Sequence, residues 1–537
     1  MKNARTTMAA LVALTSGCLP RGEPPEGRQI VADRTATLVG LLPPTGDGVL
    51  RAFFTRPIAQ NAEGPEGDLF EVSVEPTGGP PVERLLVPSV DATLGLGCGF
   101  DVSPCRGIDA GGVTVSTESD GYDVGDVRAD AITGDLVQLM GLQLLLSQDR
   151  RRFSLSNPSS QPPAVTLYDV DGQTTMLDDA SPAQFIANDF FYFTSEGVLM
   201  DVPPSGVPQQ VATGLDPCTT PSTVPGQLCQ QFWGQATPDG IALVLHMATP
   251  GPNGELWAVR DPITGTQSWL PFDASLAGLS PDGRWFLTAE SSGGSNAEYT
   301  LFDYRAGLQQ TADLPVPLNT LPGAFALVFT AHWRPGTDQV WVRSGTDTVI
   351  LEPNKPPASI PGRAVGGFTP DGAFWYSTST LSQADSLVEQ VGSADNPSGP
   401  RFDLNTPGED IDPVSQFADG TLLVPVYTDI SDEQTRGDVS VLDPRTGASR
   451  LLGQRGRIAA VGQTRVMGMF HWDEMRGDLT VADPATAQAT VLAPEFTVTA
   501  FAEPQGADQL APGTRIVYQF QARTDSPYDG IWMATAP

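Results

Sequence analysis

The segment Thr237-Pro238-Asp239-Gly240 and the apolar run after it decide the fold, because the same pattern returns along the chain. Further copies are Ser280-Pro281-Asp282-Gly283, Thr369-Pro370-Asp371-Gly372 and the weaker Ala418-Asp419-Gly420. Proline presets φ for a turn, aspartate hydrogen-bonds its own backbone, and glycine supplies the positive φ that other residues resist. The short apolar or aromatic run after each copy predicts a β-strand. We therefore interpret these aspartates and glycines as structural residues of turns.

A second pattern places one strand before an aspartate-led turn and another strand after it. Its copies are Asp261-Pro262-Ile263-Thr264-Gly265, Asp443-Pro444-Arg445-Thr446-Gly447, Asp483-Pro484-Ala485-Thr486-Ala487 and looser ones at Asp303 and Asp169. Four pairs of copies lie 40 to 48 positions apart, namely 239 and 282, 371 and 419, 261 and 303, and 443 and 483, and the second pattern follows the first by 21 to 24. Such a period is typical of a four-stranded propeller blade, whereas a β-sandwich demands no repeat of this length.

These turns and strands resemble the repeats of TolB-type and WD-like periplasmic propellers over residues 237 to 493. The unit from Trp257 to Trp269 also resembles a quinoprotein-type repeat, without implying a quinone cofactor. The resemblance implies an all-β fold, a single β-propeller over residues 36–537. At about 45 residues a blade the length would allow some eleven units, but propellers typically have 4–8 blades. We therefore expect seven or eight four-stranded blades with loop insertions, one of them at about residues 90–130.

The N-terminus has the parts of a secretory signal: a short basic start, an apolar run from Met8 to Leu14, and small residues before Cys18. It resembles the signal of a bacterial lipoprotein, in which residues 1–17 would be removed and Cys18 would carry the lipid. An ordinary secretory signal with a chance cysteine is the alternative. Residues 18–35 are expected to form a flexible tether that holds the folded part off the membrane. The expected location is the bacterial cell envelope, by resemblance the outer membrane, facing the periplasm or the cell surface.

The remaining four cysteines fall into two pairs that are close in sequence, Cys98 with Cys105 and Cys218 with Cys229. In an oxidising compartment, proximity favours two local disulfides among the three pairings that four cysteines allow. A zinc site is the competing interpretation, but the spacings are not those of paired Cys-x-x-Cys knuckles and no histidine lies near.

The charge of the chain excludes one class of function. With 63 acidic and 30 basic side chains, the formal net charge is −33 at pH 7. Because binding to phosphate backbones needs clustered lysine and arginine, nucleic acid is not expected as a partner. Contact with a membrane is expected only through the lipid anchor.

Residues for catalysis or cofactor binding do not form a recognisable pattern. The three histidines, His246, His332 and His471, are scattered, and no Gly-x-Ser-x-Gly nucleophile motif occurs. The sequence therefore predicts no catalytic residues, no metal site and no cofactor. Calcium is the ion left open, because an acidic propeller can bind it through blade loops, although Asp169-Val170-Asp171-Gly172 does not open an EF-hand loop.

The function that these observations favour is a non-enzymatic, lipid-anchored scaffold. Its partner would be an envelope protein or polysaccharide that binds to one face of the ring. The alternative is a propeller hydrolase or lyase that acts on a glycan or lactone with acidic residues converging at the central channel. Because fold does not determine function, the choice depends on what lines that channel.

Overall fold

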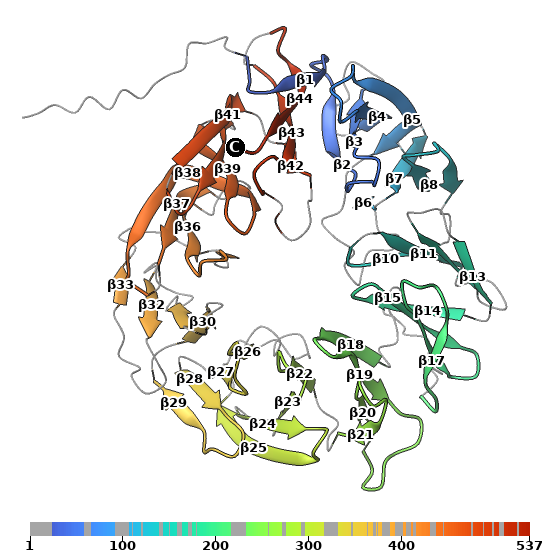
Figure 1. Cartoon of the computed structure of the whole chain (residues 1–537), viewed down its shortest axis with the longest axis vertical. Coiled ribbons are helices and arrows are strands. Elements are labelled where there is room, and N and C mark those ends of the chain that lie inside the picture. The colour runs from blue at the N-terminus through green and yellow to red at the C-terminus, as the bar shows by residue number, and fades with distance from the viewer. Residues whose placement is uncertain are drawn as a thin grey trace, which may run out of the picture.

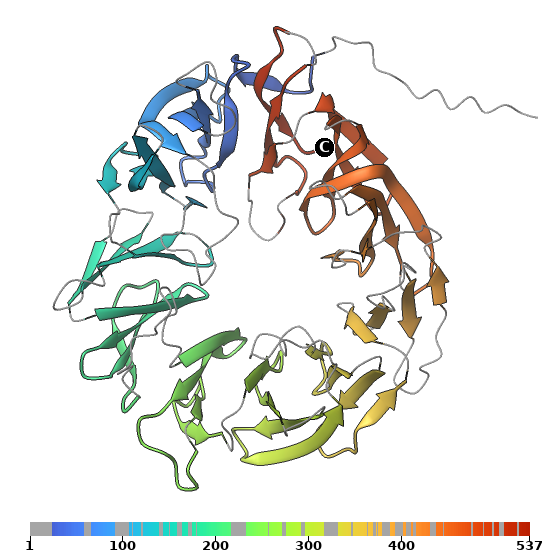
Figure 2. The same ribbon diagram turned by 180° about the vertical axis from the view of Figure 1, so that it is seen from behind.

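The computed structural model places many short antiparallel strands in a ring around an open centre (Figures 1 and 2). It describes residues 24–57, 66–91, 107–109, 111–119, 122–138, 143–149, 151–157, 164–169, 174–178, 180–215, 232–255, 257–270, 275–291, 296–315, 331–344, 347–361, 364–368, 372, 374–377, 387–391, 401–403, 410–411, 415–429, 436–443, 445–473, 476–486, 488–496, 499–503, 508, 510–522 and 526–537. These residues contain strands and no helix, so none of them forms a helix able to cross a membrane.

The strands pair in groups of four that follow one another around the ring, and we number these groups as units 1 to 11. Unit 1 comprises β2 (Thr37–Leu41), β3 (Leu50–Arg56), β4 (Glu66–Val74) and β5 (Val82–Asp91), and unit 2 comprises β6 (Gly107–Ile108), β7 (Gly112–Ser119), β8 (Tyr122–Asp130) and β9 (Leu136–Gln138). Unit 3 comprises β10 (Gln143–Leu146), β11 (Arg152–Asn157), β12 (Ala164–Asp169) and β13 (Thr174–Asp178). Unit 4 comprises β14 (Ala180–Ile186), β15 (Asp189–Thr194), β16 (Leu199–Val202) and β17 (Gln209–Ala212).

Units 5 to 8 continue in the same order of strands. Unit 5 comprises β18 (Phe232–Thr237), β19 (Gly240–His246), β20 (Trp257–Arg260) and β21 (Gln267–Trp269), and unit 6 comprises β22 (Ser275–Leu279), β23 (Trp285–Ser291), β24 (Asn296–Asp303) and β25 (Leu308–Pro315). Unit 7 comprises β26 (Ala331–Trp333), β27 (Val340–Ser344), β28 (Asp347–Leu351) and β29 (Ala358–Ile360). Unit 8 comprises β30 (Ala364–Phe368), β31 (Phe374–Ser377), β32 (Leu387–Val391) and β33 (Arg401–Asp403).

Units 9 and 10 share one strand, and unit 11 is completed by the beginning of the chain. Unit 9 comprises the short β34 (Asp410–Ile411) and β35 (Ser415–Gln416), both paired with β36 (Leu422–Asp429), then β37 (Arg436–Leu442) and the first part of β38 (Ser449–Val461). The second part of β38 pairs with β39 (Val466–Asp473), followed by β40 (Arg476–Asp483) and β41 (Gln488–Phe496). Unit 11 comprises β42 (Ala500–Ala502), β43 (Arg515–Phe520), β44 (Gly530–Thr535) and β1 (Arg28–Val31).

This arrangement is a β-propeller, as the repeat predicted, but with more units than the seven or eight expected. The described strands form seven four-stranded sheets and two eight-stranded sheets, and each eight-stranded sheet contains two units, which makes eleven. The difference arises because we assigned surplus length to insertions. Within the expected insertion at 90–130, β7 and β8 are paired strands of unit 2.

Adjacent units pack through apolar side chains and through one recurring polar contact. Clusters such as Val244, Phe286 and Phe302 span units 5 and 6. In addition, a donor on the fourth strand of one unit reaches backbone oxygens in the turn before the fourth strand of the next unit. The donors and acceptors are Arg84 to Ala131 and Ile132, Ser268 to Tyr304, Gln310 to Lys355, Arg450 to Pro484 and Ala485, and Arg28 to Gly78.

The ring closes where β1 pairs with β44, which corrects the expected tether. Residues 28–31 were expected to be part of a flexible segment, yet Gln29 pairs with Trp532 and Val31 with Ile531. Ile30 and Val31 are buried in the apolar cluster between units 11 and 1. The tether prediction failed there because a single strand that completes a distant sheet carries no repeat signature of its own.

Glycine is required at this closure. Gly530 has φ +136°, and a Cβ there would lie 2.0 Å from the carbonyl oxygen of Val31. An L side chain would therefore both strain the backbone and push the two strands apart.

We predict that Gly530→Ala lowers the free energy of unfolding by about 2–4 kcal/mol, because the new methyl group overlaps backbone of the paired strand. Chemical denaturation followed by tryptophan fluorescence measures the change. Gly46→Ala is the control, since a Cβ at Gly46 meets nothing within 4 Å. Equal midpoints for the two variants would contradict this account of the closure.

Candidate functional site

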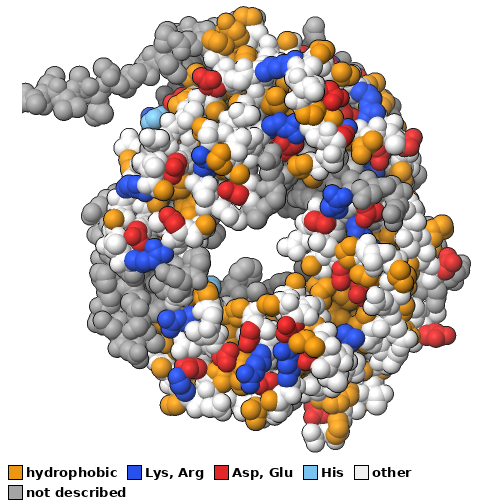
Figure 3. All heavy atoms as spheres, viewed as in Figure 1, with side chains coloured by type: hydrophobic (Ala, Val, Ile, Leu, Met, Phe, Trp, Pro, Cys, Tyr) orange, Lys and Arg blue, Asp and Glu red, His pale blue; other side chains and the backbone are white. Residues whose placement is uncertain are grey.

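The opening in the middle of the ring is the principal candidate site. The space-filling view shows it as a hole through the ring (Figure 3), and the first strands of the units, among them β2, β10, β18, β26 and β42, lie nearest to it (Figure 1). A site there would be built by many units at once.

Charged residues are scarce in the first strands. The described first strands, with β34, β35 and the second part of β38 included, contain two charged residues, Asp410 and Arg457, whereas the third strands contain nineteen. Small and uncharged residues predominate, as in Gly-Gln-Ala-Thr at the end of β18, where Ala236 is exposed. The described first strands therefore carry almost no charge in a strongly acidic protein, and we call these strands the uncharged wall.

The predicted turn residues lie on one face of the ring, which we call the turn face. It is formed by the turns between the first and second strands and between the third and fourth strands of each unit. Gly240, Gly265, Gly283, Gly372 and Gly447 all have positive φ there. Asp371 lies outside the described residues.

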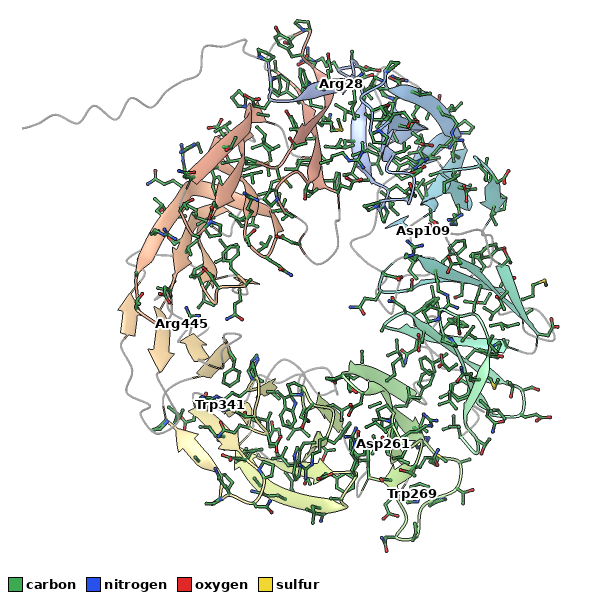
Figure 4. All side chains as sticks on the ribbon, viewed as in Figure 1. Arg28, Asp109, Asp261, Trp269, Trp341 and Arg445 are labelled. Carbon is green, nitrogen blue, oxygen red and sulfur yellow. The ribbon has the colours of Figure 1, made fainter. Side chains whose placement is uncertain are left out.

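The aspartates of the turn face hold their own turns. Asp261 Oδ1 accepts from the backbone N–H groups of Ile263 (2.7 Å) and Thr264 (3.2 Å), and the N–H of Gly265 donates to the Asp261 carbonyl oxygen. Asp443 accepts from Arg445 N–H at 2.9 Å, and Asp282 from Arg284 N–H at 3.0 Å. Figure 4 shows Asp261 and Arg445 in their units.

Arginines neutralise several of these carboxylates and join neighbouring units. Arg305 of unit 6 reaches back to unit 5, with Nη2 3.0 Å from Asp239 Oδ2 and Nε 2.9 Å from Asp261 Oδ2. Arg284 Nε lies 2.8 Å from Asp303 Oδ2. Because these carboxylates already have partners, they have a structural role in the turn face.

We expect Asp303→Ala to destabilise the protein by about 2–4 kcal/mol, because it removes a fully buried carboxylate that accepts from two backbone N–H groups and from Arg284. Asp282→Ala, an exposed turn position in the same unit, should cost about 1 kcal/mol. Thermal unfolding of both variants is the measurement, and an equal or reversed order would be inconsistent with the role assigned to Asp303.

Sequence reasoning missed one copy of the second turn. Asp130-Ala131-Ile132-Thr133-Gly134 follows the same Asp-x-x-Thr-Gly pattern, and Asp130 Oδ1 accepts from Ile132 N–H (2.8 Å) and Thr133 N–H (2.7 Å). In the same unit Arg128 forms a buried bidentate pair with Asp109, at 2.7 and 2.8 Å. The Thr-Gly signature was visible in the sequence, but it lay at the edge of the expected insertion.

The histidines occupy unrelated places. His332 is on the first strand of unit 7, where burial lowers its pKa, whereas His471 is on the second strand of unit 10, is exposed, and contacts Asp478 at 3.2 Å. His332 and His471 are each followed by a tryptophan in the sequence, but they do not occupy equivalent strand positions. The imidazole ring of His246 packs against the indole ring of Trp257, with the ring centroids 4.8 Å apart. Among the residues that the structure describes, no three His, Cys, Asp or Glu side chains are grouped to hold a metal ion.

A cluster of buried charges between units 3 and 4 was not predicted. Arg152 of β11 donates through Nη1 to the carbonyl oxygens of Asn188 and Val202, both at 2.9 Å. The carboxyl group of Asp201 on β16 interacts electrostatically with Arg152. Its Oδ1 atom is buried and has no hydrogen-bond partner in the described part of the chain. Burial, and then repulsion from Asp189, raise the pKa of Asp201 to about 7 against the attraction of Arg152 and Arg260. Burial also raises the pKa of Asp189.

The Asp201 carboxyl group should make stability depend on pH. The unfolded chain releases this proton near pH 4 and the folded chain only near pH 7, so the stability that Asp201 contributes is lost as the pH rises through this interval. We predict that Asp201→Asn becomes progressively more stable relative to the wild type between pH 4.5 and 8. Melting temperatures across this range measure the difference. The exposed Asp178→Asn is the control, and parallel curves for wild type and Asp201→Asn would refute the assignment.

All five cysteines, including Cys18 and the two predicted disulfides, lie outside the described residues, as does the signal segment. The predictions for lipidation and disulfide pairing therefore stay predictions.

No protein-family model and no curated protein matches the sequence. Solved structures with a similar arrangement include dipeptidyl peptidase 4 of Porphyromonas gingivalis, at 11% identity over 77% of this chain and 64% of the other with a TM-score of 0.32. TolB of Acinetobacter baumannii matches at 16% identity over 65% and 77% with a TM-score of 0.21. An oligogalacturonate lyase of Vibrio parahaemolyticus matches at 10% identity over 67% and 97% with a TM-score of 0.27.

The chain spans less than two thirds of the length of the dipeptidyl peptidase. With identities below 25% and TM-scores below 0.5, none of these structures shows what this chain binds or catalyses. What the paired strands themselves define is the class, a β-propeller protein with an open ring whose described first strands hold two charged residues.

Proposed function

We propose that this chain is a lipid-anchored β-propeller of the bacterial cell envelope that binds an envelope partner through its open ring and catalyses no reaction. The observation that carries the proposal is the scarcity of charge in the first strands around the opening. Anchoring at Cys18 and export to the envelope rest on the resemblance of the N-terminus to a lipoprotein signal.

The uncharged wall argues for binding over hydrolysis. Glycan-cleaving propellers would need two carboxyl groups facing each other across the substrate, and other hydrolases need preorganised charge at the reacting atoms. Asp410 is the only carboxylate of the described first strands. A wall of small and uncharged groups is suited to holding a partner by shape and by hydrogen bonds.

The net charge restricts the partner further. A polyanion would be repelled by a chain with net charge −33, and a polycation would be drawn to the acidic strands and turns outside the opening. We therefore expect a partner that presents an uncharged segment to the ring.

A charge placed on the wall should abolish binding. We predict that the chain captures its partner from detergent-solubilised envelope extracts and that Ala236→Glu reduces capture at least tenfold, because an ionised carboxylate must be desolvated against an uncharged segment. Ala448→Glu is the matched control, at an exposed position in the turn between β37 and β38.

Equal capture by the wild type and both variants would reject the opening as the binding site. Turnover of a glycan or lactone by the purified chain, abolished by Ala236→Glu and not by Ala448→Glu, would instead support the hydrolase or lyase alternative.

A further inference from the structure

Among the residues whose burial the structure describes, the exposed large apolar side chains are confined to the outer edge of the ring. Each lies on the fourth strand of a unit or in the turn before it. We call them the apolar rim: Val82, Leu85, Ile132, Leu136, Met176, Val207, Ile263, Leu308, Leu451 and Val491. Met176, Val207 and Ile263 in three successive units are 72%, 63% and 62% exposed.

The rim belongs to the turn face. In every unit the third strand ends, and the fourth begins, at the turn face, since successive strands are antiparallel. Each rim residue lies either in that turn or within the first four residues of the strand after it. The opposite end of the fourth strands carries no exposed large apolar residue among those described. The rim therefore follows one face along units 1 to 6 and along units 9 and 10.

The described chain also begins at this rim. Arg28 opens β1 and donates to the carbonyl oxygen of Gly78 in a turn of the turn face (Figure 4). The N–H of Glu26 donates to the carbonyl oxygen of Leu492, next to the rim residue Val491. From Cys18 to Pro24, where the described chain begins, is six residues, which reach at most about 20 Å when fully extended. A lipid on Cys18 would thus keep the turn face close to the bilayer.

Part of the negative charge on the turn face is compensated. Arg305 lies within ion-pair distance of Asp239 and Asp261, and Arg284 of Asp303.

We propose that the apolar rim rests on a lipid bilayer, so that the turn face lies toward the membrane and the partner enters the opening from the opposite face. The inference rests on the lipid anchor of the proposed function. It reverses the earlier expectation that a tether holds the ring off the membrane, because the chain is already part of the ring at Arg28.

The test compares two faces of the full chain on phosphatidylcholine vesicles by amide hydrogen exchange. We expect amide exchange in the rim turns, at residues 205–207 and 263–266, to slow at least threefold on vesicles, while residues 247–251 at the opposite face exchange as in solution. Unchanged exchange in both rim turns, or slowing confined to residues 247–251, would overturn the inference.

Vesicle flotation with substitutions separates the rim from the anchor. In the full chain carrying Cys18→Ser, the triple variant Met176→Ser, Val207→Ser, Ile263→Ser should reduce the vesicle-bound fraction at least threefold with an unchanged melting temperature. The control is Thr174→Ser, Gln209→Ser, Gln267→Ser, at exposed polar positions of the same fourth strands. Equal bound fractions for the two triple variants, or no bound fraction before they are made, would count against the rim.

Mass spectrometry of membrane-extracted protein tests the anchor by itself. An unmodified Cys18 would refute the anchor, and flotation of the chain without an acyl group would still decide the role of the rim. An acylated Cys18 with unprotected rim turns would leave the anchor in place and refute the rim.

Discussion

A closed ring of strands depends on its last sheet, because that sheet must join two distant parts of the chain. Here β44 takes β1 as its outermost partner, and the apolar cluster of units 11 and 1 forms behind the pair. Further contacts secure the junction: the Tyr518 hydroxyl donates to the carbonyl oxygen of Glu26, and Arg515 donates to that of Gly48 at 3.0 Å. Every other unit is made from one continuous segment, so closure of the ring depends on this junction.

The architecture was predictable where the chain repeats itself. The turns at Asp239, Asp282 and Asp443 can be recognised in the sequence because their backbone needs Asp and Gly at fixed positions. A period near 43 residues is the length of four strands and their connections. The number of units was not predictable in the same way. Units such as the one formed by β10 to β13 have strands without the full turn signature, since packing against neighbours also specifies a strand.

The candidate site was less accessible to sequence reasoning. That the first strands hold almost no charge can be read only after the strands are assigned to their places in each sheet. The Asp201 cluster could not be found at all from local sequence, because Arg152, Asp189 and Asp201 come together through the packing of two units. Its unusual carboxyl group is a product of burial, and burial is a property of the folded chain.

The shared strand β38 limits how this ring can change. Elsewhere the step from one unit to the next passes through residues outside the strands, from the single residue Asp179 between β13 and β14 to the nineteen residues 213–231 between β17 and β18. Between units 9 and 10 the chain passes within one strand, with Arg455 at φ 45° and Phe470 packed where a Cβ on Gly453 or Gly456 would lie. Added residues would displace Phe470 and shift the register of both sheets. We therefore expect related chains to vary in length at the other junctions and to keep this one constant.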